Sequence, residues 1–311
     1  MNEPKVFIII LNWNGLEDTI KCLESLKKIT YSNYEVIIVD NGSHGDDADI
    51  LDRNYREYIK LIRNAENTGF TGGNNLAIKW LLQNSNPDYF LLLNNDTVVH
   101  PELLTEIVKV AENDLQIGIV GPKTYVLDLP EIIQTVWVDL DMYRGRATLA
   151  GLLDTDKGQY NEIRSVDCVQ GSCLLIKKKV IEQVGLLDED YFCYWEETDY
   201  CLRTRKAGYK IYYSPKAVIW HKNTVTVGLE PWYKTILSRE RDSLSISKTY
   251  YMTRNTYRFM KKNASRREYL SFISYFFCYW SWYRSAVILL YYRQISVLGA
   301  FIKGTWDGLL I

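Results

Sequence analysis

The segment that decides the fold is Val6-Phe-Ile-Ile-Ile-Leu-Asn-Trp-Asn-Gly15, in which six apolar residues run directly into a polar turn. Short apolar runs of this kind recur along the first part of the chain, at 6–11, 36–40, 61–63, 89–93 and 117–121. Helix-like stretches separate them, at 16–28, before Tyr58, at 74–83 and at 101–113. Strands that are apolar on both faces and alternate with helices indicate an α/β fold with a parallel sheet covered on both sides.

The predicted strands end in polar residues, namely 12–15, 40–43 and 94–96. Ligands of open α/β sheets bind beyond the carboxyl ends of the strands, so these residues are candidates for a binding site. Asp40 could bind the ribose of a dinucleotide, but that fold needs a G-x-G-x-x-G turn after the first strand. Trp13 and two asparagines occupy that turn, which argues against a dinucleotide-dependent oxidoreductase.

Composition and charge divide the chain into two parts. The 311 residues are 47% hydrophobic and 14% aromatic, enough for one large domain with an appendage and unlike a disordered chain. The net charge of −1 gives no whole-chain argument for nucleic-acid binding, but residues 232–311 hold 13 Lys and Arg against 4 Asp and Glu. We therefore predict a catalytic domain over 1–225 and a basic, aromatic helical region over 226–311, with different partners.

The cysteines and the N-terminus suggest a location. Six scattered cysteines without a C-x-x-C pair, and only three histidines, exclude a zinc ribbon. The first apolar run is too short for a secretory leader and has no small-residue cleavage site after it. We expect the catalytic part to be cytoplasmic, where thiols stay reduced.

Two polar segments suggest a phosphate-bearing ligand. Asp96 follows the buried run 89–93, where its carboxylate could bind Mg²⁺ together with phosphate oxygens, or could instead cap the helix expected near Pro101. Gly69, Gly72 and Gly73 open the next predicted helix, and backbone that can come close to a helix N-terminus suits a phosphate.

The segment Tyr191-Phe-Cys-Tyr-Trp-Glu-Glu-Thr-Asp-Tyr-Cys-Leu-Arg203 places three acids among aromatic residues at the start of a predicted helix. On that helix Glu196 and Asp199 share a face, and either could pair with Arg203 for structural reasons. Glu197 points about 100° away. Aromatic surroundings could raise its proton affinity, as a general base acting on a sugar hydroxyl requires.

Together these segments resemble the family 2 glycosyltransferases of the GT-A fold, in particular the rhamnosyltransferase-like branch. The resemblance covers about residues 1–225 and rests on seven segments in the family's order: 6–15, 39–43, 67–74, 92–96, 170–172, 194–197 and 220–221. It implies a Rossmann-like mixed sheet with helices on both faces, followed by a C-terminal helical extension.

The resemblance also implies an inverting transfer from a nucleoside-diphosphate sugar, dTDP-rhamnose or a UDP-sugar, to a hydroxyl of a glycan or lipid-linked glycan. Glu197 resembles the general base, while Asp96 and His221 resemble the residues that bind Mg²⁺ or Mn²⁺. Asp40 resembles the acid that hydrogen-bonds the pyrimidine base. The full set assigned to donor binding is Asn12, Trp13, Asn14, Asp40, Asn41, Asn67, Gly69, Gly73, Asn74, Asn95, Gly171, Ser172 and Glu196.

Two positions depart from the family pattern. Asn94 occupies the position of the first acid of the D-x-D element, so Asp96 is the one carboxylate of this element that remains to bind the metal. The base is Glu197, where the family commonly has Asp. Two other classes stay open: a non-catalytic nucleotide-sugar-binding scaffold of the same fold, and a nucleotidyltransferase, which would normally need a cationic triphosphate loop that residues 12–15 lack.

The tail suggests a surface partner. Between Asp242 and Glu268 there are seven cations and no acid, and residues 269–283 hold nine aromatics without a charge. Fifteen residues are short of the roughly 20 that cross a bilayer, so we expect an interfacial helix at the inner face of the cell membrane. The alternative is a helical pair that packs on the catalytic domain or on a second subunit, as in a homodimer.

Overall fold

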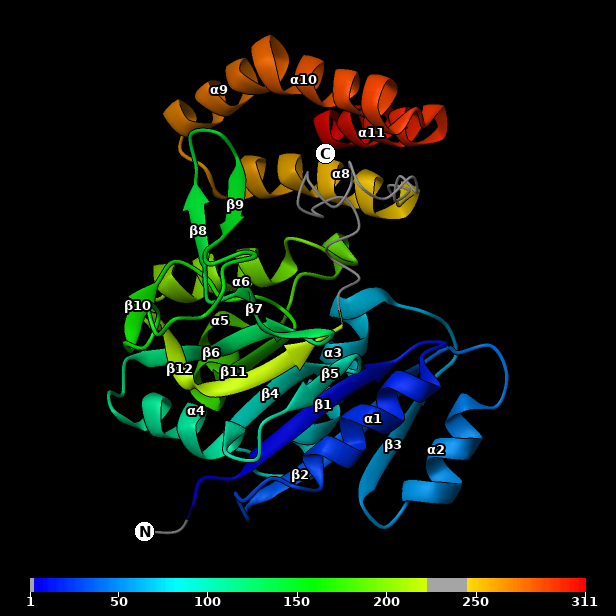
Figure 1. The fold of residues 1–311 in the computed structure, drawn as a ribbon, viewed down its shortest axis with the longest axis vertical. Coiled ribbons are helices and arrows are strands. Elements are labelled where there is room, and N and C mark those ends of the chain that lie inside the picture. The colour runs from blue at the N-terminus through cyan, green and yellow to red at the C-terminus, as the bar shows by residue number, and fades with distance from the viewer. Residues whose placement is uncertain (1–2, 223–244) are drawn as a thin grey trace. The chain divides into compact units, whose positions relative to one another are not determined.

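The computed structural model describes residues 3–222 and 245–311, which form two compact units. The first comprises residues 1–139, 149–192 and 196–222, and the second comprises 140–148, 193–195 and the chain from 223 onward. The domain boundary predicted between residues 225 and 226 lies outside the described residues. Figure 1 labels the elements, which we describe unit by unit.

The first unit is built on a ten-stranded mixed sheet in the described part of the chain, whose main path has the order β10-β12-β6-β11-β4-β1-β2-β3. β5 pairs with β12 and β7 pairs with β6. The strands are β1 Val6–Asn12, β2 Tyr34–Asn41, β3 Ile59–Asn64, β4 Tyr89–Asn94, β5 Thr97–Val99, β6 Ile117–Val126, β7 Leu129–Thr135, β10 Arg164–Val166, β11 Cys173–Lys177 and β12 Lys210–His221.

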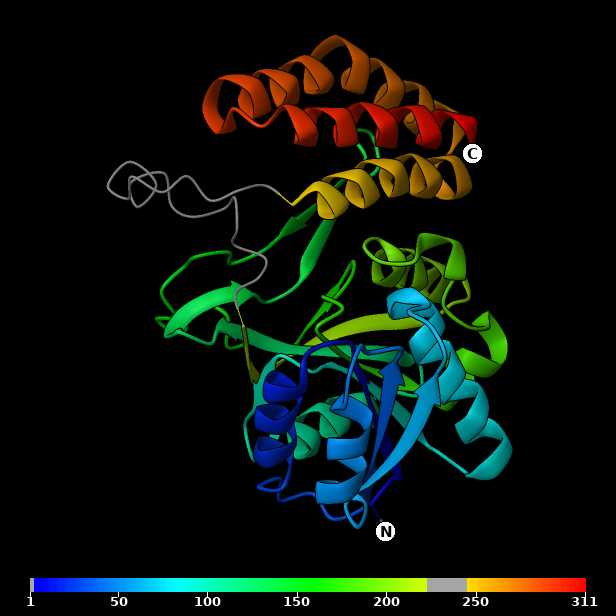
Figure 2. The same cartoon turned by 90° about the vertical axis from the view of Figure 1, so that its right-hand side faces the viewer.

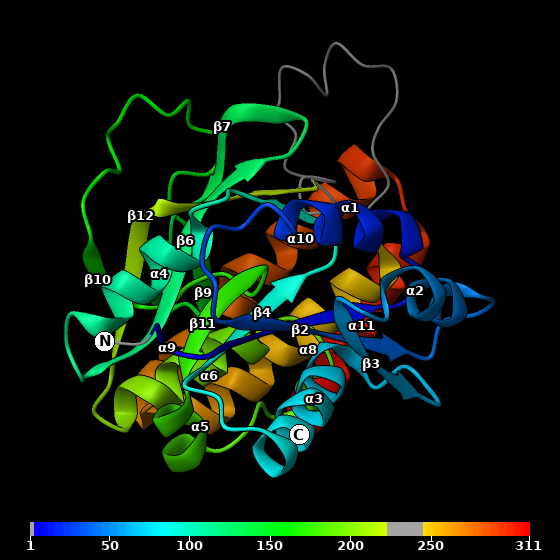
Figure 3. The ribbon, with the colours of Figure 1, turned by 90° about the horizontal axis from the view of Figure 1, so that it is seen from below.

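Helices cover both faces of this sheet. They are α1 Leu16–Leu26, α2 Asp47–Tyr55, α3 Gly69–Asn84, α4 Leu103–Glu112, α5 Lys178–Val184 and α6 Glu196–Lys206, with a short 3₁₀ turn at Glu189–Tyr191. Figure 3 shows α1, α2 and α4 on one side of the sheet and α3, α5 and α6 on the other. Because both faces are covered, strand β1 is buried from Val6 to Ile10 without alternation, as the sequence predicted.

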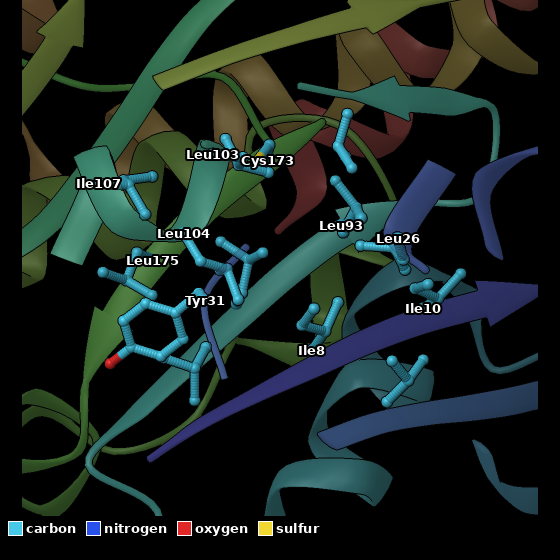
Figure 4. Packing of buried hydrophobic residues seen from close by; sticks show 14 of the residues in the cluster. Ile8, Ile10, Leu26, Tyr31, Leu93, Leu103, Leu104, Ile107, Cys173 and Leu175 are labelled. Atoms are coloured by element: carbon cyan, nitrogen blue, oxygen red, sulfur yellow. The ribbon is translucent and has the colours of Figure 1, made fainter. Parts of the chain in front are cut away.

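Strands β3, β2, β1 and β4 pair in parallel, whereas β11 runs antiparallel to both β4 and β6. The parallel register places Asn12 opposite Asp40, and Leu11 opposite Asn94. The polar ends of these three strands therefore lie at one edge of the sheet. Between α1 and α4 and the sheet, an apolar core includes Ile8, Ile10 and Leu93, each almost fully buried (Figure 4).

Strands β8 Val138–Asp141 and β9 Arg146–Leu149 form a separate two-stranded sheet. The turn of this hairpin belongs to the second unit, where a Cβ on Gly145 would come within 2.6 Å of the ring of Phe272. Arg144 and Arg146 lie over the rings of Tyr275 and Trp280. The hairpin turn is thus packed against helix residues of its own unit.

The second unit is otherwise helical. Its helices are α8 Ile246–Asn263, α9 Arg266–Tyr275, the π-helical segment η2 Phe276–Trp280, α10 Ser281–Ala286, the π-helical segment η3 Val287–Tyr292 and α11 Ile295–Leu310. Ser265 and Glu268 form a capping box at the start of α9. Among residues 3–222 and 245–311, no helix has the length and apolar character needed to cross a bilayer.

Helices α8 and α11 lie side by side (Figure 2) because glycines on α11 let the two backbones approach. A Cβ on Gly304 would come within 2.7 Å of the carbonyl oxygen of Tyr250, and one on Gly308 within 2.8 Å of Cβ of Tyr257. Asn255 of α8 donates from Nδ2 to the carbonyl oxygens of Cys193 and Tyr194, at 2.8 and 2.9 Å. These contacts join segments of the unit that are distant in sequence.

Candidate active site

The site is assembled where parallel strands end. Asp40, at the end of β2, is only 5% exposed and accepts hydrogen bonds at Oδ1 from Asn12 Nδ2 (3.0 Å) and Ser43 Oγ (2.6 Å). Asn12 Nδ2 also lies 3.0 Å from Asp47 Oδ2, so the Asn12 amide holds two carboxylates in place. Asn12 itself is fully buried and supports Asp40 rather than presenting a free group.

A cavity of about 470 Å³ opens beside Asp40. Its lining includes Trp13, whose side chain is 51% exposed, together with Ser43, Arg63 and Asn67. An exposed indole beside a buried carboxylate can hold a flat heterocycle, by ring contact on one side and a hydrogen bond to the carboxylate on the other. Asn14 borders this region, where its Oδ1 accepts from the backbone N–H of His44 at 2.7 Å.

The loop from residue 64 to the start of α3 is stabilised by hydrogen bonds from buried asparagine side chains. Asn41 Nδ2 donates to Asn67 Oδ1 (3.1 Å) and to the carbonyl oxygen of Gly69 (3.0 Å). Asn74 Nδ2 donates to the carbonyl oxygen of Phe70 at 2.8 Å. The side chains of Asn41 and Asn74 are buried, so their amides stabilise the loop and the first turn of α3.

Glycines at the start of α3 accommodate neighbouring protein atoms. Gly69 has φ +74°, a conformation that other residues rarely adopt, and a Cβ there would overlap the carbonyl oxygen of Phe192. A Cβ on Gly73 would come within 3.0 Å of the methyl groups of Leu11. Helix α3 begins at Gly69, so the glycines open it as expected, although the helical stretch predicted from the sequence was 74–83. Close packing accounts for both glycines.

A second group surrounds Asp96. Oδ1 of Asp96 lies 3.0 Å from Nε2 of His221, and Asn94 Nδ2 lies 3.3 Å from the same nitrogen. The side chains of Asp96 and His221 are 17% and 4% exposed. Strand register explains why the side chains of His221 and Asp96 meet. His221, at the end of β12, pairs with Thr97 of β5, and Thr97 is the residue after Asp96.

The donor set fits a divalent cation. Nδ1 of His221 lies 2.8 Å from Oε1 of Gln134, so it is the nitrogen that donates, and the lone pair of Nε2 then faces the carboxylate of Asp96. Two acceptors at 3.0 Å repel each other unless a proton or a cation lies with them. Within 3–222 and 245–311, no three or more His, Cys, Asp or Glu residues lie together so that they could hold a metal ion. Mg²⁺ commonly takes one or two carboxylates together with phosphate oxygens and water.

Asp96 does not cap the next helix. Helix α4 has Glu102 at its N-cap position, without a side-chain cap, and begins at Leu103. The carbonyl oxygen of Asp96 instead accepts from the backbone N–H of Lys222 at 2.9 Å. The capping alternative is therefore wrong, and the carboxylate of Asp96 is left to face His221.

The third group lies at the start of α6. Glu197 is partly exposed and packs against Gly171, where an added Cβ would lie 3.6 Å from its side chain. Burial of its carboxyl group raises the pKa of Glu197, while backbone N–H groups, including that of Gly171, oppose the increase. Glu196 is buried, and burial followed by the charge of Glu197 raises its pKa well above the ordinary value.

Asp199 has a structural role, which confirms one of the predicted alternatives. Its Oδ2 accepts from Arg203 Nε at 2.7 Å, and its Oδ1 accepts from the hydroxyl of Tyr191 at 3.3 Å. The guanidinium group of Arg203 also donates to the carbonyl oxygens of Val184 and Leu186. Asp199 thus ties α6 to the preceding segment, whereas Glu197 faces the 170–172 turn.

Four buried oxygen atoms of this region have no hydrogen-bond partner in the described part of the protein. They are Oε1 of Gln170, Oγ of Ser172, Oε2 of Glu196 and Oε2 of Glu197. Buried acceptors without donors are costly, so such a group favours a ligand that presents several hydroxyl groups.

One chain of contacts joins all three groups within the first unit. Asn12 Oδ1 accepts from Thr19 Oγ1 (2.7 Å), and Thr19 Oγ1 accepts from Asn95 Nδ2 (2.9 Å). From the same strand end, the backbone N–H of Asn94 donates to the carbonyl oxygen of Ser172 at 2.9 Å. Ser172 follows Gly171, against which Glu197 packs. The predicted site residues from Asp40 to Glu197 therefore form one continuous edge.

Several residues of this edge were not assigned from the sequence. Thr19 links Asn12 to Asn95, Ser43 supports Asp40, and Gln134 orients His221. Ser43 and Gln170 lie inside quoted motifs and could have been found there. Gln134 lies on β7, 87 residues from its partner, and no local pattern indicates it.

Comparison with known proteins identifies the family of this chain. Residues 4–241 match the family model described as "Glycosyltransferase like family 2". The low-salt glycan biosynthesis hexosyltransferase Agl10 of Haloferax volcanii is 27% identical over 204 residues, a match that covers 66% of this chain and 62% of the relative. An N-acetylglucosaminyl-diphospho-decaprenol L-rhamnosyltransferase of Mycobacterium tuberculosis is 25% identical, with coverages of 67% and 73%.

Among solved structures, the mannosyltransferase PcManGT of Pyrobaculum calidifontis, in complex with GDP-Man and Mn²⁺, superposes with a TM-score of 0.60 at 14% identity. The superposition covers 99% of this chain and 88% of that one. The mixed sheet, the covering helices and the C-terminal helices confirm the predicted GT-A fold. The chain belongs to glycosyltransferase-like family 2.

Proposed function

We propose that the protein is an inverting glycosyltransferase that moves a sugar from a nucleoside-diphosphate donor to a hydroxyl group of a glycan or lipid-linked glycan. One observation carries the proposal: Asp40, the Asp96–His221 pair and Glu197 lie along one edge of the sheet, connected through Asn12, Thr19, the 94–96 strand end and the 171–172 turn. The names of the relatives support the substrate class, since one is a hexosyltransferase and the other a rhamnosyltransferase acting on a lipid diphosphate.

The donor base would occupy the cavity beside Asp40, against the indole of Trp13. Asp40 accepts from the N–H of the base, while Asn12, Asn41 and Asn74 keep the surrounding loops in place. The sugar would extend toward Gly171 and Ser172, where the four unpartnered oxygens would form hydrogen bonds with its hydroxyl groups. We propose dTDP-rhamnose or a UDP-sugar as donor.

Asp96 and His221 would hold Mg²⁺ or Mn²⁺ together with the donor diphosphate, with Asn95 beside them on the same strand end. The bound cation supplies neutralisation of the charge that the departing nucleoside diphosphate develops. Gln134 keeps the hydrogen on Nδ1 of His221, so that Nε2 is available as a ligand. The Mn²⁺ in the PcManGT complex supports a divalent metal.

Glu197 would take the proton from the acceptor hydroxyl as that oxygen attacks the anomeric carbon from the face opposite the diphosphate. The raised pKa suits a base that must gain a proton near neutral pH. Attack from the opposite face inverts the configuration at that carbon. Burial, followed by the charge of Glu197, raises the pKa of Glu196 and so favours the protonated form, in which its carboxyl group can donate to a sugar oxygen.

A donor panel tests the proposal directly. The protein is incubated with Mn²⁺ and dTDP-, UDP- and GDP-sugars, and release of nucleoside diphosphate is followed with and without a chelator. We expect release from a dTDP- or UDP-sugar that stops when the metal is removed. Tight nucleotide binding without release from any donor, even with glycan and lipid-linked acceptors added, would instead favour a non-catalytic binding protein.

A further inference from the structure

Helix α11 is apolar on both sides although only one side is packed. Val297, Ala300, Phe301, Gly304 and Gly308 are buried. The opposite side presents large apolar residues, which we call the outer face of α11: Ile295, Ile302, Trp306, Leu309 and Leu310. At 3.6 residues per turn these five positions fall on one side of the helix. Trp306 is 63% exposed and Leu310 is 69% exposed.

The helical run from Arg266 to Tyr292 shows the same excess of exposed apolar surface. Trp282 is 73% exposed and Leu290 is 77% exposed. Other large hydrophobic residues of this run that are exposed are Leu270, Phe277, Tyr279, Tyr283, Leu289 and Tyr291. Single exposed hydrophobic residues are ordinary, but a cluster on one small unit indicates a partner that covers it.

Cations accompany this apolar surface. Residues 245–311 contain ten Lys and Arg against Glu268 and Asp307, a net charge of +8. The exposed cations include Lys261, Arg266, Arg267 and Arg293. A partner that covers the surface should therefore be apolar in part and negatively charged.

We propose that the outer face of α11 and the exposed aromatic residues of the 266–292 run insert into the headgroup region of an anionic lipid bilayer. No helix in the described ranges can span the membrane, so the helices would lie in its plane. Tryptophan and tyrosine favour the boundary between headgroups and acyl chains. Each Lys or Arg close to the surface adds attraction to anionic lipid.

A second copy of this chain is a poorer partner for the same surface. Contact between two copies would bring together two 245–311 segments that each have a charge of +8, and like charges oppose association. An anionic bilayer offers the opposite charge and an apolar interior at once. The inference concerns attachment and does not depend on the proposed transferase activity.

The test uses the full-length protein and flotation with vesicles of phosphatidylcholine alone or mixed with phosphatidylglycerol. We expect flotation with the mixed vesicles, and weaker binding as salt is raised. Trp282→Gln combined with Trp306→Gln should lower the partition coefficient about tenfold. The matched control is Leu115→Gln in the first unit, where Leu115 is 83% exposed and lies outside the proposed surface.

A second pair of variants separates charge from apolar contact. The double variant Arg266→Glu, Arg267→Glu should lower binding to mixed vesicles about tenfold or more. The control is Lys109→Glu with Lys157→Glu, which makes the same change of charge on exposed residues of the first unit and should have little effect. Circular dichroism checks that each variant is folded. A wild-type protein that stays unbound with mixed vesicles overturns the proposal. A dimer in gel filtration that the double tryptophan variant converts to a monomer, without vesicle binding, assigns the surface to a second copy.

Discussion

The two units depart from ordinary protein architecture in opposite ways. The sheet unit buries polar side chains, among them Asp40, Glu196 and His221, while only Thr249 and Asn255 are buried polar residues between 245 and 311. The helical unit exposes apolar ones: of 22 exposed large hydrophobic residues in the described parts of the chain, 16 lie in 245–311.

Both departures cost stability, since buried polar groups lose hydration and exposed apolar groups order water. In the sheet unit the buried groups converge on one edge and leave acceptors unpartnered, as a hydroxyl-rich ligand requires. In the helical unit the exposed groups cover the outside of a small bundle, as a surface partner requires. The contrast teaches that the sheet unit leaves buried polar groups unpaired, whereas the helical unit leaves apolar side chains exposed. The following predictions test whether changes in one unit affect the function of the other.

The largest expected effect falls on Glu197. Glu197→Gln removes the proposed proton acceptor but keeps the shape of the side chain, so turnover should fall by roughly 10²- to 10⁴-fold with donor affinity almost unchanged. Nucleoside diphosphate release and calorimetric titration of the donor measure the two quantities. Glu57→Gln, at an exposed position, is the control. Wild-type turnover in Glu197→Gln would move the base to another residue.

The second largest effect is expected on the affinity for the metal ion. Asp96→Asn replaces the one carboxylate of the Asp96–His221 pair, so the affinity for Mn²⁺ in the presence of nucleoside diphosphate should fall about 10- to 100-fold. Electron paramagnetic resonance of free Mn²⁺ reports this without any turnover. Asp128→Asn, the same change at an exposed aspartate, should leave the affinity unchanged. Equal affinity in both variants would mean that Asp96 is not a ligand.

A pair of glycine variants tests whether the helical unit can be weakened alone. Gly304→Ala forces a Cβ against the Tyr250 carbonyl oxygen and should cost roughly 1–3 kcal/mol of stability. Gly299→Ala on the same helix meets nothing within 4 Å and should stabilise it by up to about 1 kcal/mol. Thermal unfolding measures both, and nucleotide binding should survive in each. Loss of nucleotide binding in Gly304→Ala would show that the units are coupled.

The smallest effect is a pH-dependent gain from Glu196→Gln. Burial raises the pKa of Glu196, so folding takes up a proton above its ordinary pKa of 4.5, and stability falls as pH rises toward the raised value. Glutamine does not titrate, so the variant should melt higher than wild type at pH 7, by roughly 2–4 °C for each kcal/mol relieved. The difference should disappear below pH 4.5. A gain that is the same at all pH values would exclude titration as its cause.

The sequence predicted the parallel centre of the sheet well because its strands are uninterrupted apolar runs. The predicted strand at 6–11 corresponds to β1 Val6–Asn12, and that at 89–93 to β4 Tyr89–Asn94. An apolar run does not indicate strand direction, so the mixed character of the sheet was expected from the family resemblance alone, and no strand was predicted at 173–177, where β11 lies. Nothing was predicted for β7 to β10: β8, β9 and β10 have only three or four residues each, and β7 begins with three exposed residues, so it lacks the uninterrupted apolar run of the central strands.

For the site, helix periodicity correctly separated Asp199, which pairs with Arg203, from Glu197, which faces Gly171. The supporting residues could not be derived in this way. Thr19 meets Asn95, and Gln134 meets His221, only after the strands have paired, so these contacts follow from tertiary register and not from local pattern.

The order of the sheet has a consequence for how the chain behaves at high concentration. Its main path ends at β3 on one side and at β10 on the other, and an unprotected terminal strand can recruit another chain into a growing sheet. β3 places Lys60 and Arg63 on its exposed positions, and β10 is only three residues long and begins with an exposed Arg164. Intermolecular strand addition is opposed at both ends, so this fold resists fibrillar aggregation through the main path of its sheet.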